Sequence, residues 1–468
     1  MKIERLLPVL LIGQTVTTTN QLCYSQDKSP NIVFILTDDM GWKDLACYGN
    51  RFTETPNIDA LAKNGIRFTQ SYAACPVSSP TRASIMTGKY PARLHLTNFI
   101  AGNRTDKDSP VLPANWKPYL EAREITIAEL LKEKGYTTGM VGKWHLGGHD
   151  SIAPWNQGFD LTRMIGKNGL DYYNYSIFLD SYQNEFIDKG TEYLTDKLTD
   201  YGVEFIRQNK GNQFFLYLAY SAPHVVIVPR PDKLMKYFRK YSNADEKFNP
   251  YYSAMVESID DGVGKVIETL KEVAALENTL IIFTSDNGGL GLDELGPIPT
   301  SVLPLRKWKG HVYEGGIRVP AIMSWQGKIK PGMISEEYFS SVDYLPTFCE
   351  ITGLNAIPRD IDGIIILPLM KGENMKMDER PLYWHYPHFS NQLGRPAGAV
   401  RVGDYKLVES YETGKVELYN LTDDISELKD LSGKMKQKTK DLHILLKNWR
   451  SKVNANMPLA NPEYQPYK

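Results

Sequence analysis

The sequence predicts an α/β fold: a large mixed, mostly parallel sheet sandwiched by helices, followed by a smaller antiparallel sheet with a helix. Two observations favour this class. Short apolar runs alternate with amphipathic stretches through most of the chain, which is typical of strands and helices in an α/β sheet. From about residue 375 the pattern changes to strands that follow one another through short turns, with one helix near the end.

The strands of the large sheet are predicted from continuous apolar runs, and the helices from their periodic apolar residues. The strands are expected at residues 32–36, 137–141, 214–220 and 280–283. The helices are expected at residues 58–68, 126–134, 196–208 and 253–272, with Thr126 as the N-cap of the second. In the last part of the chain we expect strands at 381–386, 399–402, 405–408 and 416–421 and a helix at 435–453.

Composition and charge exclude several classes of protein. Of the 468 residues, 42% are hydrophobic and 23% charged, which excludes a disordered chain, a collagen-like fibre and a small disulfide scaffold. The 54 Lys and Arg balance 55 Asp and Glu, so the electrostatic footprint of a nucleic-acid-binding protein is missing and no nucleic-acid partner is expected. The length fits one large domain and a smaller one.

The first residues are typical of an export signal. Lys2 and Arg5 precede a short apolar core at residues 6–12 and a Thr-rich stretch, so residues 1–25 are predicted to be a signal peptide. We therefore expect an exported bacterial protein, periplasmic or at the cell surface, without a transmembrane segment. Lipid anchoring at Cys23 is not expected, because Leu22 rather than a small residue precedes it.

The predicted organisation divides the mature chain into a catalytic domain at residues 26–374 and a C-terminal subdomain at residues 375–468. Three cysteines remain after the signal, at positions 47, 75 and 349. Because an odd number cannot all pair, disulfides are not expected to organise the fold.

Polar residues follow each of the four predicted strands where the strand ends. The residues concerned are Asp38 and Asp39, Lys143 and His145, His224, and Asp286 and Asn287. In open α/β sheets ligands bind beyond the carboxyl ends of the strands. The sequence therefore predicts one polar site assembled from distant segments.

Two of these strand ends supply only oxygen donors, Asp38 with Asp39 and Asp286 with Asn287. Carboxylate and amide oxygens suit a hard cation, so we expect Ca²⁺, with Mg²⁺ as the other possibility. Either pair alone is more often a turn or a helix cap. Together they favour a metal, because a shared cation relieves the repulsion between carboxylates.

The segment 75–93 predicts a helix start with a possible nucleophile. Pro80 fits the first turn of a helix, which places Ser78 near the N-terminus, where backbone N–H groups attract an anion. Arg82 follows one turn later. By itself this is an ordinary helix start.

Here the sequence resembles the formylglycine-dependent sulfatases of the alkaline-phosphatase superfamily. Their signature is Cys or Ser, then Pro or Ala at +2, Arg at +4 and a later Thr-Gly; counting from Ser78 gives Pro80, Arg82 and Thr87-Gly88. Counting from Cys75 gives Val77 at +2 and Ser79 at +4, and neither matches the signature. Six segments match in the family's order, at residues 31–41, 75–93, 142–147, 221–224, 284–289 and 305–320.

The resemblance implies a mechanism and a role for each residue. Ser78 would be oxidised to formylglycine by a serine-type maturase, and the hydrate of the aldehyde would attack sulfur to form a covalent sulfo-enzyme intermediate. Asp38, Asp39, Ser78, Asp286 and Asn287 would hold the metal. Arg82 and Lys143 would steady the hydrate, His145 would act as base for the elimination of sulfate, and His224 with Lys309 would hold the sulfate and protonate the leaving oxygen.

The resemblance favours an O-sulfated carbohydrate as substrate. Trp155, Tyr172, Tyr173, Trp384, His385 and His388 are candidates to contact the sugar, although packing explains each of them more simply. The loop at residues 99–124 is a candidate for the rim of the site, and Glu314 with Arg318 is predicted to be a structural pair.

Two other functions stay open at this point. The same scaffold could serve a phosphodiester or phosphonate hydrolase. If Ser78 is never oxidised, the chain could be a non-catalytic glycan-binding relative. Outside the resemblance, a lone histidine at a strand end and a lone lysine are more often structural or solvated residues.

Overall fold

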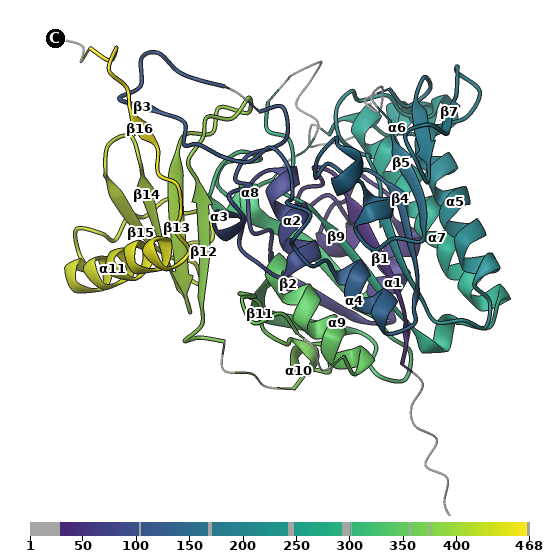
Figure 1. Cartoon of the computed structure of the whole chain (residues 1–468). Coiled ribbons are helices and arrows are strands. Elements are labelled where there is room, and N and C mark those ends of the chain that lie inside the picture. Colours follow the sequence, from purple (N-terminus) through teal and green to yellow (C-terminus); the bar gives the residue numbers. More distant parts are fainter. Residues whose placement is uncertain are drawn as a thin grey trace, which may run out of the picture.

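The computed structural model describes residues 29–465, apart from 103, 167–170, 242–247, 293–299, 301, 355–356, 374 and 376 (Figure 1). The predicted signal peptide and Cys23 lie outside the described residues. No described helix has the length and apolar character needed to cross a membrane.

A ten-stranded sheet forms the centre of the larger part, in the order β11-β2-β10-β9-β1-β8-β4-β5-β6-β7. The middle strands β9, β1, β8, β4 and β5 pair in parallel, and antiparallel pairs join β10, β6 and β7 to them. Its strands are β1 (Asn31–Thr37), β2 (Ile66–Tyr72), β4 (Thr137–Gly142), β5 (Leu161–Ile165), β6 (Ser176–Leu179), β7 (Glu185–Ile187), β8 (Phe214–Ala219), β9 (Thr279–Ser285), β10 (Arg318–Ser324) and β11 (Met333–Ser340). The predicted α/β class and the four predicted central strands are confirmed.

Both faces of the sheet are covered by helices, because the central strands are apolar on both sides. Phe34 of β1 packs into one hydrophobic cluster, with residues of α2, α4 and α9, whereas Val33 and Ile35 pack into a second cluster with α1, α5 and α7 (Figure 1). Successive side chains of a strand point to opposite faces, so one short run supplies both cores. The helices of this part are α1 (Pro56–Lys63), α2 (Ser78–Thr87), α3 (Pro91–Leu94), α4 (Ile127–Glu133), α5 (Leu194–Gln208), α6 (Pro231–Tyr241), α7 (Pro250–Glu272), α8 (Glu314–Ile317), α9 (Tyr344–Thr352) and α10 (Leu367–Met370).

Helix α4 begins as predicted. The Thr126 hydroxyl accepts the Glu129 amide, and the Glu129 carboxylate accepts the Thr126 amide, which together form a capping box.

The helix predicted at residues 58–68 is wrong in its second half. Helix α1 ends at Lys63, and strand β2 begins at Ile66. Gly65 marks the change: a Cβ there would lie 2.1 Å from the carbonyl oxygen of Met323, so the chain passes directly against β10. Ile66 and Phe68 fit a helical spacing and a strand alternation equally well, and pairing with β10 and β11 selects the strand.

The smaller part is a four-stranded antiparallel sheet of β12 (Pro381–Tyr386), β13 (Ala397–Val402), β14 (Tyr405–Ser410) and β15 (Val416–Asn420), covered by α11 (Lys436–Lys452). Trp449 of α11 stacks on Tyr383 with ring centroids 4.5 Å apart, and Tyr90 of the larger part packs edge-on against Trp449. The Trp384 indole N–H donates to the carbonyl of Ala73 at 2.8 Å. The predicted strands and helix of this part are confirmed, while the domain boundary at residue 374 stays a prediction.

The remaining elements are short. They are the two-stranded sheet of β3 (Val111–Leu112) and β16 (Leu459–Ala460), and the 3-10 turns Ala46–Tyr48, Asp150–Ile152, Pro154–Asn156, Leu276–Asn278 and Ser341–Asp343.

Candidate active site

Two parallel strands deliver four oxygen-bearing side chains to one place. Strands β1 and β9 are in register, with Thr37 opposite Ser285, so the residues that follow both strands emerge side by side. The Asp39 amide donates to Oδ1 of Asp286 at 3.2 Å, and Nδ2 of Asn287 donates to Oδ1 of Asp39 at 2.7 Å. These side chains are fully buried at the carboxyl end of the sheet.

Ser78 is the first residue of α2 and points into this cluster. Its Oγ lies 3.1 Å from Oδ1 of Asp38 and 3.2 Å from Oδ1 of Asn287. The helix starts here because Val77 is extended and Pro80 falls in the first turn, where the missing N–H costs no hydrogen bond. Every residue of α2 is buried, so packing of the helix holds the nucleophile candidate in place.

Arg82 ties the helix to both strand ends. Its Nε donates to Oδ2 of Asp286 at 2.9 Å, and its Nη2 forms an ion pair with the same oxygen at 2.8 Å. Its Nη1 donates to the carbonyl of Lys143 at 2.8 Å. The side chain is fully buried. Arg82 therefore fixes the Asp286 carboxylate and the loop after β4 relative to Ser78.

Two lysines and a histidine lie beside the carboxylates. Nζ of Lys143 contacts Oδ2 of Asp38. Nζ of Lys309 lies 2.7 Å from Oδ2 of Asp39, and Nε2 of His224 lies 3.4 Å from the same oxygen. Backbone hydrogen bonds position Lys309: its amide donates to the carbonyl of Gly289, and the amide of Gly310 donates to the carbonyl of Pro76.

His145 lies beside the cavity with one ring nitrogen free. Nε2 is 3.3 Å from the carbonyl oxygen of Ile100, and Nδ1 is buried without a hydrogen-bond partner among the described residues. Burial, together with the charges of Lys143 and Arg82, lowers the pKa of His145 well below its usual value. The imidazole is therefore neutral at pH 7 and able to accept a proton.

The carboxylates repel one another. Burial opposes the ionisation of Asp38, but Lys143 and the other nearby cations hold its pKa well below the usual value. Burial and the charge of Asp38 raise the pKa of Asp286 to about 6. For Lys309, Asp39 and Asp38 raise the pKa although burial opposes the charge.

The donor set fits a hard divalent cation. Oxygen atoms of Asp38 and Asp39 lie within 4.8 Å of each other and of a ring nitrogen of His224. Burial and the neighbouring charge of Asp38 oppose the ionisation of Asp286, and a bound cation relieves such repulsion between buried carboxylates. The residues that the sequence predicted as ligands are thus brought together, and their role as ligands stays a prediction.

A cavity of about 790 Å³ lies above the cluster. Ser78, Lys143, His145, His224 and Lys309, all predicted from the sequence, line it. Phe99, Ile100 and Ala101 of the predicted rim loop do so as well. Arg82 and the predicted oxygen ligands Asp38, Asp39, Asp286 and Asn287 lie buried behind this surface.

The six aromatic and histidine candidates for sugar contact are not among the residues that line the cavity. Trp384, Tyr172 and His388 are buried in the core, and His385 is held between Tyr411 and the carbonyl of Asn456. The cavity wall instead uses residues that the sequence analysis missed, chiefly Met164, Phe178 and Tyr182. Met164 and Phe178 lie on the short strands β5 and β6, and Tyr182 follows β6; none of them belongs to a motif, so no sequence signal marked them.

Glu314 and Arg318 pair at 3.4 Å, as expected for a structural pair, but they belong to a larger buried network. Lys406 of β14 lies 2.9 Å from Glu314 and 3.0 Å from Glu427, and Glu427 accepts the Glu314 amide. Glu427 thus joins the loop after β15 to the loop that carries Lys309.

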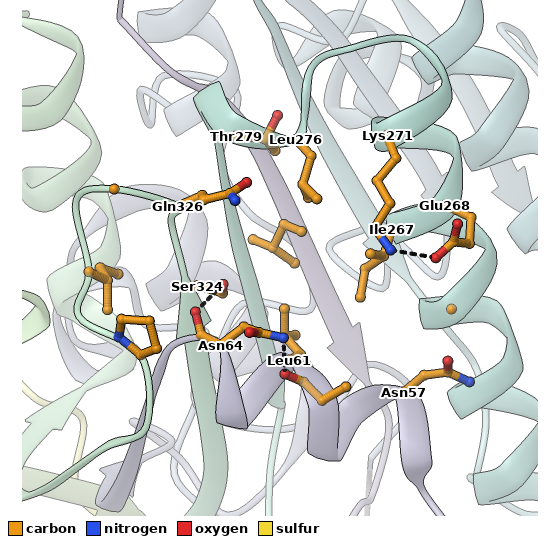
Figure 2. Close-up of a pocket in the computed structure, with 16 residues that line it drawn as sticks. Asn57, Leu61, Asn64, Ile267, Glu268, Lys271, Leu276, Thr279, Ser324 and Gln326 are labelled. Carbon is orange, nitrogen blue, oxygen red and sulfur yellow. Dashed lines mark hydrogen bonds and ion pairs between the residues drawn. The ribbon is translucent and has the colours of Figure 1, made fainter.

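A second hollow, of about 350 Å³, lies at the opposite edge of the sheet, where β9 begins at Thr279 and β10 ends at Ser324 (Figure 2). Figure 2 shows Lys271 paired with Glu268 on α7 and Ser324 bonded to Asn64. None of the predicted site residues is among the residues that line it.

Comparison with known proteins matches this chain to two family models. The model "Sulfatase" matches residues 30–354, and "N-sulphoglucosamine sulphohydrolase, C-terminal" matches residues 307–452. A sulfatase of Formosa agariphila is 31% identical, with 98% of this chain and 95% of the relative covered. The N-acetylgalactosamine-6-sulfatase of Canis lupus familiaris is 34% identical over 81% of this chain and 71% of its own length.

Among solved structures, Ps i-CgsB in complex with k-i-k-neocarrahexaose superposes with a TM-score of 0.77 at 30% identity. The match covers 94% of this chain and 96% of that chain.

Proposed function

The chain belongs to the sulfatase family, and we propose that it hydrolyses an O-sulfate ester on a carbohydrate, with Ser78 as the residue that is oxidised to formylglycine. The observation that carries this assignment is the position of Ser78. Its Oγ lies between Asp38 and Asn287 at the start of a buried helix, on the floor of the cavity. An N-terminal helix end with nearby cations suits an anionic ester.

We assign the metal ligands to Asp38, Asp39, Asp286 and Asn287, together with the oxidised side chain of residue 78, and Ca²⁺ or Mg²⁺ as the ion. When bound, such a cation lowers the pKa of a coordinated hydroxyl and stabilises charge on the sulfuryl oxygens. The charges of the chain support this: three aspartates balance Arg82, Lys143 and Lys309, so a divalent ion leaves the site net positive for a sulfate ester.

The other ionisable residues of the site each take part in proton transfer or in the stabilisation of charge. Arg82 and Lys143 hold Asp286 and Asp38 beside residue 78 and steady the hydroxyls formed there. Lys309 and His224 meet at one oxygen of Asp39, where they can hold a sulfuryl oxygen and protonate the leaving alcohol. His145, neutral and with a free Nδ1, accepts the proton when sulfate is expelled.

A sulfated saccharide as substrate is supported by the relatives. One is an N-acetylgalactosamine-6-sulfatase, and a structural neighbour holds a neocarrahexaose. We further propose that a serine-type maturase oxidises Ser78, and that the protein acts after export, in the periplasm or at the cell surface, as the signal-like residues 1–25 suggest.

The test is sulfate release by protein co-expressed with a serine-type maturase, with mass spectrometry of the peptide that contains residue 78. We expect oxidised Ser78 and release of sulfate from a panel of sulfated sugars, with little hydrolysis of matched phosphate esters and phosphonates. Ser78→Ala should abolish release. Ser84→Ala, which removes a buried hydroxyl from the same helix outside the cavity, should retain it.

Sulfate release that survives Ser78→Ala would overturn the assignment. Preference for phosphorus esters would support the phosphodiester or phosphonate hydrolase instead. An unmodified serine in protein from the native source would support the glycan-binding relative.

A further inference from the structure

The cavity above Ser78 has two sides of different chemistry. The floor carries the ionisable residues Lys143, His145, His224 and Lys309. The wall is made by strands β5 and β6 with the residues that follow them, and by the loop before residue 102. A volume of about 790 Å³ is in the range of small-molecule sites, so the cavity has room for a leaving group beside the sulfate.

The wall is aromatic and fixed in place. The Tyr182 ring packs edge-on against Phe178 with centroids 5.0 Å apart, and against Trp155 with centroids 4.8 Å apart. Met164 and Phe178 belong to the same buried hydrophobic cluster as Phe34. A rigid aromatic and aliphatic surface binds the apolar face of a ring, such as the C–H face of a sugar.

Among the described residues, the wall also offers no charged side chain that could pair with a second anionic group. Among the described residues that line the cavity, the ionisable side chains are Tyr182 and the four residues of the floor. Three of those four, Lys143, His224 and Lys309, already contact Asp38 or Asp39, and His145 is neutral. A second sulfate or a carboxylate on the leaving group would lose water here without gaining a counterion, which is costly.

From this composition we propose that the surface formed by Phe99, Ala101, Met164, Phe178 and Tyr182 is the leaving-group subsite, and that it takes an uncharged ring. The inference rests on the proposed function. The preferred substrate is then a sugar whose sulfated residue carries one sulfate and no uronate, with its further charges, if any, on neighbouring units outside the cavity.

Ala101 allows a direct test, because its side chain is exposed and it lines the cavity. The matured enzyme would be given galactose 6-sulfate, N-acetylgalactosamine 6-sulfate and 4-methylumbelliferyl sulfate, and each sugar again with a second sulfate. We expect kcat/KM at least about tenfold higher for a monosulfate than for the disulfate of the same sugar. Ala101→Lys should narrow that ratio several-fold, whereas the neutral control Ala101→Gln should leave it unchanged.

The outcomes separate the two proposals. Equal or faster cleavage of disulfates, or a ratio that Ala101→Lys leaves unchanged in an enzyme still active on monosulfates, overturns the neutral subsite and leaves the sulfatase assignment standing. If enzyme with oxidised Ser78 releases sulfate from none of these compounds while it cleaves phosphate esters, the proposed function fails and the subsite falls with it.

Discussion

Nζ of Lys309 lies 2.7 Å from Oδ2 of Asp39, so a lysine from an irregular loop and an aspartate at a strand end share one buried contact across 270 positions of sequence. Both side chains have little or no access to solvent. A buried charge pair depends on both members, because removing one leaves the other as a buried charge without a counterion. The pair therefore links the ligand cluster to the residues proposed to meet the substrate.

Lys309→Met should reduce kcat about 10²- to 10³-fold, because it removes a cation aimed at the transferred group. Steady-state sulfate release by matured protein measures this. Lys307→Met is the matched control: Lys307 lies two residues earlier, does not line the active cavity and should keep near wild-type kcat. Equal losses in the two variants would contradict the role of Lys309.

Removal of divalent ions should lower the melting temperature and abolish activity, because three buried carboxylates lose the cation that relieves their mutual repulsion. Ca²⁺ or Mg²⁺ added back at about 100 times its dissociation constant should restore about 2.7 kcal/mol of stability. Differential scanning calorimetry with chelator, Ca²⁺ and Mg²⁺ measures the shift and ranks the ions. In Asp38→Asn the ion-dependent shift should shrink; a wild-type melting temperature indifferent to chelation and to both ions would contradict a metal site.

Asp260 should make stability fall as the pH rises. Its carboxylate accepts the amides of Asn57 and Ile58 at the start of α1, and burial raises its pKa to about 6. Between about pH 4 and 6 the folded protein binds more protons at this group than the unfolded chain, so ionisation costs folding free energy.

Relative to Asp260→Asn, the wild-type free energy of unfolding should therefore drop by up to about 3 kcal/mol from pH 4 to pH 7. Urea titrations at several pH values measure the difference. A difference that stays constant over this range would show that Asp260 titrates alike in the folded and unfolded chains.

Lys406→Met should destabilise the protein by about 3–5 kcal/mol, because the buried carboxylates of Glu314 and Glu427 would both lose the ammonium group that lies between them. Glu427→Gln should cost less, about 1–2 kcal/mol, because burial already raises the pKa of Glu427 to about 7 and glutamine resembles the protonated acid. The exposed Lys415→Met should change stability by less than about 0.5 kcal/mol. Urea unfolding compares the three; a Glu427→Gln loss as large as that of Lys406→Met would contradict this account.

Much of the fold could be predicted because the central strands are buried on both faces and are therefore continuous apolar runs, as at residues 32–36. Strand β2 could not be predicted, since Ile66 and Phe68 fit a helix and a strand equally well. Pairing with β10, against which the chain passes at Gly65, decides between the two. The convergence of Asp38 and Asp286 was predictable from the rule that ligands meet at the carboxyl ends of parallel strands.

The leaving-group wall was not predictable. Phe178 lies in an ordinary apolar run and Tyr182 in the polar turn after it, and their place at the cavity depends on how β5 and β6 pair beside β4. The reverse error affected Trp384 and His388, whose side-chain types suit a sugar but which packing has buried elsewhere.

The sequence by itself determined which residue types carry the chemistry: a serine at the start of a helix, carboxylates after strands, and lysines and histidines in three separate loops. It could do so because ligands bind beyond the carboxyl ends of the strands in an open α/β sheet, so polar residues that follow several strands indicate a shared site. The tertiary structure decided which of them share an atom, as Lys309 and His224 share Oδ2 of Asp39, and which apolar side chains face the cavity. Contacts of that kind depend on strand register and on close packing of the core, and neither is a local property of the chain.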